Sequence, residues 1–142
     1  MSRINLGRVI LGGIVAGVII NIGEFVLNGI LIADDMNAAM AALNRPPIDP
    51  RMILWFVLFS FGFAFVLVWT YAAIRPRFGA GAKTALCAAS LCWGLGYLYP
   101  NLFFYVMNLF PRNMIVLTSI WGLVEVSLAG VAGAWVYKEA NP

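Results

Sequence analysis

The chain is organised as four long apolar runs, each bounded by charges, prolines or glycines. A helix needs about 20 mostly apolar residues to cross the hydrocarbon core of a bilayer, and each run reaches that length. The charged, proline-containing segment 75–77 closes the second run. We therefore predict an all-α membrane protein, a bundle of four transmembrane helices that forms a single domain, residues 1–142. The predicted spans cover about residues 9–33, 52–74, 84–108 and 114–137.

The connection between the first two runs, 34–51, is long enough for a short surface helix in the first outer loop. Asp34 or Asp35 is expected to cap this helix, which continues through Leu43, because a carboxylate accepts hydrogen bonds from the first backbone N–H groups of a helix. The prolines that follow favour an extended return to the second span. Only 109–113 separates the last two runs, which predicts a tight hairpin.

The distribution of basic residues predicts the orientation in the membrane. With four spans, one side carries Arg3, Arg8, Arg75, Arg77, Lys83 and Lys138, and the other carries Arg45, Arg51 and Arg112. Short cytoplasmic flanks carry the excess of lysine and arginine, so both termini are expected to be cytoplasmic. The first span is interpreted as a retained signal anchor, because it is too long for the core of a cleaved leader.

The composition agrees with this class and excludes several others. Hydrophobic residues make up 63% of the chain and charged residues only 11%, too few charges to cover the surface of a soluble enzyme. With no histidine and no cluster of metal-ligating residues, we expect no metal and no cofactor. The net charge of +3 is explained by membrane topology, and without a basic groove that carries stacking aromatic residues we expect no nucleic-acid partner. Cys87 and Cys92 lie five residues apart on one predicted helix, so they point to different faces, and we interpret them as small buried hydrophobic residues.

Two ionisable residues fall inside predicted spans, Glu24 and Glu125. A charge near the bilayer centre costs about 2.5 to 3.5 kcal/mol even on the mild insertion scale, so such residues suggest a functional site. Glu24 shares one helical face with Asn21 and Asn28, and with two glycines that allow a neighbouring helix to approach. That face is expected to point into the protein.

The other spans carry comparable polar faces. The third has Cys87, Ser90, Gly94, Tyr97 and Asn101 at helical spacing. Counting along the helices places Asn101 and the two glutamates at similar depths, so a shared interior cluster is possible. At least one carboxyl of a close, dry pair is expected to be neutral. The candidate ligand- or ion-binding residues are Glu24, Glu125, Asn21, Asn28, Asn101 and Tyr97, and none is expected to be catalytic. The alternative is that these groups only hydrogen-bond neighbouring helices. The phenylalanine-rich second span is expected to face lipid or another subunit.

Three stretches carry a family resemblance: NIGEFVLNG (21–29), YAAIRPRFGAGA (71–82) and WGLVEVSLAGVAGAWVYKE (121–139). With these motifs the chain resembles a group of uncharacterised bacterial four-span integral membrane proteins. The resemblance implies a bacterial inner (plasma) membrane location, and it implies no activity or site residues.

Two functions are weighed for such a chain. The first is a non-enzymatic accessory or structural subunit of a membrane assembly, favoured by short loops and the lack of a soluble domain. The alternative is an oligomeric small transporter or channel in which Glu24 and Glu125 bind a proton or cation. An enzyme is not expected, because no nucleophile with a base can be assembled from these residues. The expected partners are the lipid bilayer and other membrane subunits or further copies of the chain.

Overall fold

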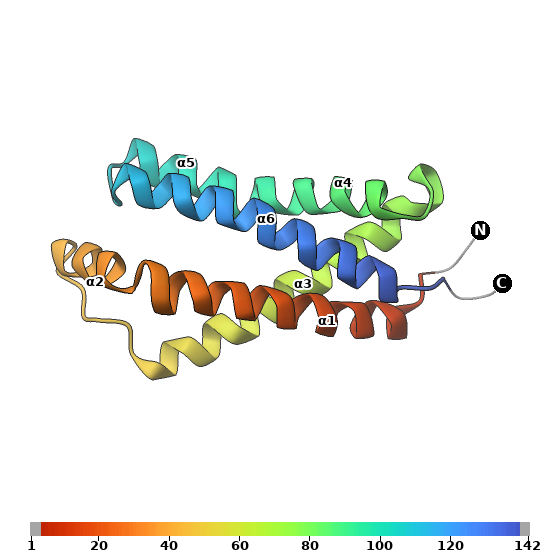
Figure 1. Cartoon of the computed structure of the whole chain (residues 1–142), viewed down its shortest axis with the longest axis horizontal. Helices are drawn as coiled ribbons and strands as arrows, with labels where there is room; N and C mark the ends of the chain where they lie inside the picture. The colour runs from red at the N-terminus through yellow and green to blue at the C-terminus, as the bar shows by residue number, and fades with distance from the viewer. Residues whose placement is uncertain (1–3, 140–142) are drawn as a thin grey trace.

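The computed structural model describes residues 4–139, which form helices and no strand (Figure 1). There are five continuous helical segments. In chain order their parts are α1 (Leu6–Val26) continued by the π-helical segment η1 (Leu27–Leu31), α2 (Ala33–Ala42), α3 (Pro50–Phe78), α4 (Ala82–Trp93) continued by the π-helical segment η2 (Gly94–Leu98) and α5 (Tyr99–Val106), and α6 (Arg112–Val136). The predicted all-α fold class is confirmed.

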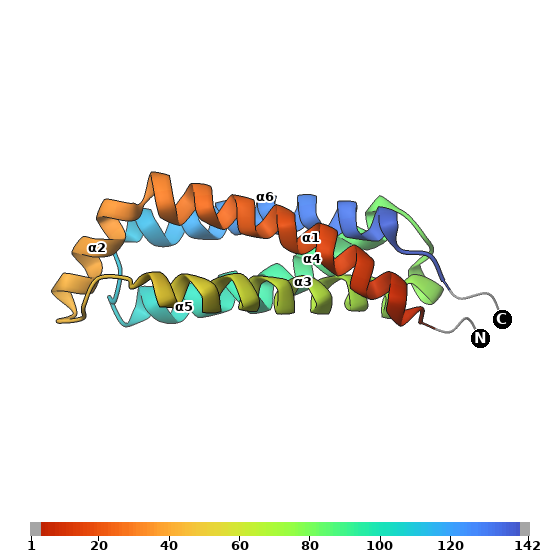
Figure 2. The same ribbon diagram turned by 90° about the horizontal axis from the view of Figure 1, so that it is seen from below.

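Four long helical segments run side by side in alternating directions (Figures 1 and 2). α1 packs against α3 and α6, and α4 packs against the same two helices. Both ends of the described chain and the turn between α3 and α4 lie at one end of the bundle, which we call the terminal end. The opposite end, with α2 and the turn between α5 and α6, is the loop end.

Three helices are long and apolar enough to cross a membrane: Leu6–Leu31, Pro50–Phe78 and Arg112–Val136. The prediction named four such spans and is therefore confirmed for three of them. The remaining segment, 82–106, is helical throughout, but η2 interrupts its α-helical register. Its tyrosines, Trp93 and Asn101 also make it less apolar than the others.

Two predicted boundaries are corrected. The second span does not end at Ile74, because α3 continues through Pro76 to Phe78. A proline so near the end of a helix removes few bonds, and the N–H of Gly79 still reaches the carbonyl of Arg75. The short helix after the first span is present as α2, but neither aspartate caps it. Asp34 and Asp35 lie inside its first turn, and Ile32 is the N-cap residue.

Phenylalanine rings of α3 pack directly against glycines of the neighbouring helical segments. Phe65 and Phe61 of α3 cover Gly13 and Gly17 of α1, where a Cβ atom would overlap the rings. Phe63 covers Gly96 on η2, where a Cβ would lie 2.7 Å from the ring. The expectation that the phenylalanines of α3 face lipid or a partner is therefore wrong for these three, because α1 and η2 offer side-chain-free surfaces into which the rings fit.

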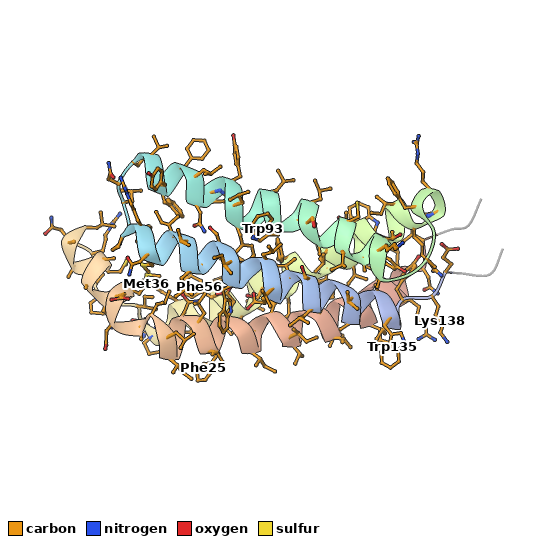
Figure 3. The ribbon with its side chains drawn as sticks, turned by 45° about the horizontal axis from the view of Figure 1, so that its top comes forward. Phe25, Met36, Phe56, Trp93, Trp135 and Lys138 are labelled. Atoms are coloured by element: carbon orange, nitrogen blue, oxygen red, sulfur yellow. The ribbon has the colours of Figure 1, made fainter. Side chains whose placement is uncertain are left out.

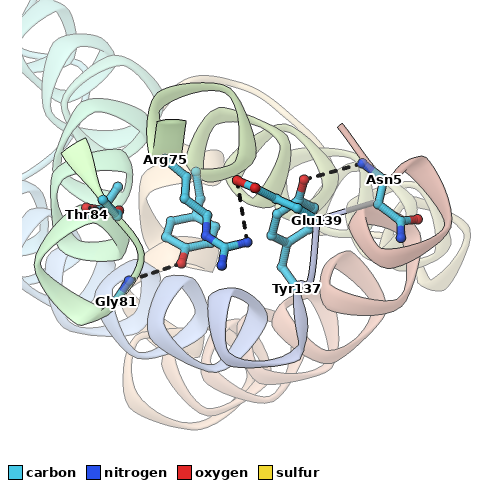
Figure 4. A network of polar contacts seen from close by, with 8 residues as sticks. Asn5, Arg75, Gly81, Thr84, Tyr137 and Glu139 are labelled. Carbon is cyan, nitrogen blue, oxygen red and sulfur yellow. Dashed lines mark hydrogen bonds and ion pairs between the residues drawn. The ribbon is translucent and has the colours of Figure 1, made fainter. Parts of the chain in front are cut away.

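A network of polar contacts ties the helix ends together at the terminal end (Figure 4). The hydroxyl of Tyr137 accepts from the N–H of Asn5 at 3.3 Å, and the hydroxyl of Tyr71 accepts from the N–H of Gly81 at 3.2 Å. The guanidinium of Arg75 lies 5.5 Å from the ring centre of Tyr137 and pairs with Glu139 at 3.7 Å. Arg3, counted in the orientation argument, lies outside the described residues.

Candidate functional site

Three ionisable side chains from three helical segments meet inside the bundle. The hydroxyl oxygen of Tyr97 on η2 lies 2.9 Å from Oε1 of Glu24 on α1 and 3.1 Å from Oε1 of Glu125 on α6. Glu125 is buried, with 5% of its surface exposed, whereas Glu24 and Tyr97 are half-buried. We call these three residues the triad.

The second oxygen of each carboxyl also has a hydrogen-bond donor. The side-chain amide of Asn28 donates to Oε2 of Glu24 at 2.6 Å and to the backbone carbonyl of the same residue at 3.1 Å. The indole N–H of Trp121 donates to Oε2 of Glu125 at 3.2 Å. All four carboxyl oxygens of the triad therefore lie at hydrogen-bond distance from a partner.

Two glycines make room for the triad. A Cβ atom at Gly23 on α1 would overlap the carboxyl of Glu125, and one at Gly122 on α6 would overlap the ring of Tyr97. These helices can therefore bring the acidic and phenolic groups together only because neither position carries a side chain.

Both π-helical segments lie at the level of the triad. η1 contains Asn28, and the N–H of Ile32 closes it onto the carbonyl of Leu27, five residues back. η2 contains Tyr97, and the N–H of Tyr99 likewise reaches the carbonyl of Gly94. Pro100 has no N–H to offer the carbonyl four residues before it, so a regular ladder cannot continue there. Wider turns of this kind occur frequently at functional sites.

The π turn of η2 decides which face of the third long helix is inside. Ala85, Ala89 and Cys92 are buried at α-helical steps of four and three, and Tyr97 follows after a step of five. The predicted inner face, through Cys87 and Ser90, is instead exposed, because a constant α-helical period does not include this extra residue. The interpretation of Cys87 as a buried residue is wrong for the same reason, while Cys92 is buried as predicted.

Apolar packing surrounds the triad along the bundle. On the loop-end side, Leu27, Ile32 and Met114 are buried, and Trp121 packs against them. On the terminal-end side lies the main core of small and branched side chains from α1, α3, α4 and α6. α3 contributes Phe63, whose ring meets that of Tyr97 edge to face at 5.8 Å. Among residues 4–139, neither glutamate of the triad forms an ion pair with a basic side chain.

The hydrogen-bonding capacity of the triad limits its protonation state. A phenolic hydroxyl carries one hydrogen, and ionised carboxylates only accept. Tyr97 can therefore donate to one glutamate, and its second contact becomes a hydrogen bond only if the other carboxyl is protonated and donates to the phenol oxygen. With both contacts formed as hydrogen bonds, at least one of the two carboxyls carries a proton.

The other two predicted site residues, Asn21 and Asn101, form no hydrogen bond with the triad. The side-chain amide of Asn21 bonds back to the carbonyl of Gly17 on its own helix at 2.8 Å. The amide of Asn101 donates to the hydroxyls of Thr118 and Ser119 on α6, at 3.1 and 2.8 Å. Six candidate ligand- or ion-binding residues were predicted from the sequence. The structure connects four of them by hydrogen bonds: Glu24, Asn28, Tyr97 and Glu125.

Trp121 and Gly23 were not predicted as parts of the site. The spacing of Trp121 to Glu125, four residues on one helix, is a signal that could have identified the tryptophan. Gly23 carries no such signal, because its contact with Glu125 crosses between helices. Within the described residues, no group of three or more histidine, cysteine, aspartate or glutamate side chains is placed to hold a metal ion.

No known protein family, curated protein or solved structure matches the chain.

Proposed function

We propose that the protein is a small proton-coupled membrane transporter in which the triad binds and releases the proton. The observation that carries this proposal is the placement of one phenolic hydroxyl between two carboxyls, within 3.1 Å of both. A helix-packing role needs only one neutral polar group, whereas two glutamates at this depth incur a charge penalty that serine or glutamine would avoid. A pair of carboxyls such as Glu24 and Glu125 is suited to bind and release a proton.

The same contacts favour a proton over a metal cation. A sodium or calcium ion requires several oxygens whose lone pairs converge on it. Here Asn28 and Trp121 donate to the outer carboxyl oxygens, and Tyr97 lies between the inner ones. A metal ion would have to displace these partners, while a proton fits among them without rearrangement.

We further propose that segment 82–106 is a fourth span and that both termini face the cytoplasm of a bacterium with the protein in its inner membrane. The terminal end carries Arg8, Arg75, Arg77, Lys83 and Lys138, and the loop end carries Arg45, Arg51 and Arg112. This excess of basic residues supports the orientation through the positive-inside rule. Since the described residues form one small helical bundle, a transport pathway is expected to be shared between copies of the chain.

Proton flux into liposomes tests this proposal. Purified protein is reconstituted with an internal pH-sensitive dye, and uptake is followed after an external pH step. Wild type is expected to carry protons, while Glu24→Gln and Glu125→Gln fall to the level of protein-free liposomes. Glu139→Gln is the matched control, because Glu139 lies at the terminal end and pairs with Arg75. Flux in both triad variants equal to wild type would contradict a proton-coupled mechanism.

A second candidate function is the accessory subunit, favoured by the loop-end half of α3. Its side chains from Ile53 to Phe56 are each more than half exposed, and α5 has no buried residue. Such faces suit contact with a neighbouring membrane protein as well as with lipid. Gentle extraction of the native protein followed by mass measurement separates the two functions. A stoichiometric complex with a different protein supports the subunit, and a homo-oligomer supports the transporter.

A further inference from the structure

A groove of about 510 Å³ runs along the outer face of α6. Its walls are apolar apart from Ser127, and Leu86 of α4 also lines it. On α6 it extends from Leu123 to Trp135. None of the three triad residues lines the groove. The groove is therefore separate from the candidate proton site.

The length of the groove matches half a bilayer. Leu123 and Trp135 are twelve residues apart on one helix, which corresponds to about 18 Å at 1.5 Å per residue. The hydrocarbon core of a bilayer is about 30 Å thick, so one leaflet contributes about 15 Å. The groove begins at the terminal end of the bundle and stops near the depth of Glu125, which is the depth reached by one acyl chain.

Positive charge marks the terminal end of the groove. Lys83 precedes Leu86 by three residues on α4, which places it on the same helical face one turn closer to that end. Lys138 follows the last turn of α6, and Figure 3 shows it at the same end as Trp135. Both lysines are exposed, and Trp135, 86% exposed, places its amphipathic ring where lipid headgroups lie. Glu139, the residue after Lys138, pairs with the guanidinium of Arg75 at 3.7 Å and not with either lysine.

The geometry points to a binding site for one anionic phospholipid, with an acyl chain in the groove along α6 and the phosphate headgroup between Lys83 and Lys138. An apolar channel alone would accept any lipid. The two lysines at its headgroup end select a negatively charged one, since each basic residue near the surface adds to the attraction for anionic lipid. This site is independent of the proposed proton transport.

Native mass spectrometry of the purified protein tests the assignment. Phosphatidylglycerol and phosphatidylcholine with identical acyl chains are titrated in parallel, and glycerol phosphate serves as the headgroup without chains. Wild type is expected to retain phosphatidylglycerol preferentially and not to bind glycerol phosphate. The double variant Lys83→Gln/Lys138→Gln is expected to lose about 30-fold in affinity for phosphatidylglycerol. Ser127→Phe, which fills the groove, is expected to weaken both lipids.

The matched control is Arg45→Gln/Arg51→Gln, which removes the same charge at the loop end and is expected to retain the preference. Equal retention of both lipids by wild type would overturn the proposal. So would phosphatidylglycerol binding that the two lysine substitutions leave unchanged. Binding of glycerol phosphate alone would show a phosphate site rather than a lipid site, and a dimer that forms through this face in place of lipid would show that the groove receives a second copy of the chain.

Discussion

Gly23 on α1 lies directly against the carboxyl of Glu125 on α6, so closely that a Cβ atom at position 23 would overlap Oε2. The buried carboxyl therefore occupies space that only a glycine leaves. Gly122 provides the same kind of recess for the ring of Tyr97. The distance between the two carboxyls of the triad is thus set by two positions that carry no chemistry themselves.

Gly23→Ala and Gly122→Ala are expected to separate the triad. Each added methyl group displaces a triad side chain, so proton flux should fall to the background of protein-free liposomes. Overpacking of this kind costs about 1 to 3 kcal/mol in unfolding free energy. Gly62→Ala and Gly94→Ala are the controls, because a Cβ at either position meets nothing within 4 Å. If the controls lose as much flux as the triad-facing variants, the effect is a general one of glycine replacement.

Tyr97→Phe removes the hydroxyl shared by the two glutamates and leaves the ring in place. The expected result is a folded protein with lost proton flux and an unfolding free energy lowered by about 1 kcal/mol, the usual magnitude for a hydrogen bond between helices in a membrane. Tyr99→Phe is the matched control two residues away, since Tyr99 is 58% exposed. Equal flux in the two variants would show that the phenol does not participate.

The two glutamates are expected to act as a unit. If they share one proton, Glu24→Gln and Glu125→Gln should each abolish flux, and the double variant should be no worse than either single one. Glutamine keeps the hydrogen bonds from Asn28 and Trp121, so all three variants should remain folded. Two partial, additive losses in the flux assay would indicate two independent sites.

The approach of α1 to α6 near the terminal end is expected to limit stability. A Cβ at Gly12 would lie 2.7 Å from the carbonyl oxygen of Gly133, which is backbone and cannot rotate away. Gly12→Ala should therefore lower the unfolding free energy by about 1 to 3 kcal/mol. Gly7→Ala, on the same helix with its nearest neighbour at 3.6 Å, should be close to neutral in the same denaturation assay.

Hydropathy alone predicted the helical fold and three of the helices long and apolar enough to cross a membrane. A long apolar run depends on the hydrocarbon environment that suits such a helix and not on any single contact between helices. The polar face of the first span correctly indicated that Glu24 and Asn28 point inward. Periodicity was wrong for the helix that carries Tyr97, because a π turn adds a residue that no constant period contains. Asn21 matched the pattern but bonds to its own backbone, a choice between local partners that spacing cannot predict.

Contacts between helices were the least predictable part of the site. Asn101 was predicted at the depth of the two glutamates, but its partners Thr118 and Ser119 precede Glu125 by seven and six residues on α6. At 1.5 Å per residue this is about 10 Å along the axis, so Asn101 lies closer to the loop end than the triad. The close contact of Gly23 with the carboxyl of Glu125 depends on how α1 and α6 are rotated about their axes. A single sequence gives the face of each regular helix, but neither the relative shift of two helices along the bundle nor how their faces are turned toward each other.

The central claim is that Glu24 and Glu125 share one proton through Tyr97, and carbon-13 spectra of labelled glutamate side chains test it most directly. The chain has three glutamates, so the spectrum of the reconstituted protein holds three carboxyl signals, with Glu139, which pairs with Arg75 at the terminal end, as the reference outside the triad. At neutral pH we expect one proton on the pair formed by Glu24 and Glu125, and Tyr97→Phe is expected to change both carboxyl signals. Two fully ionised or two fully protonated membrane glutamates, unaffected by that substitution, would contradict it.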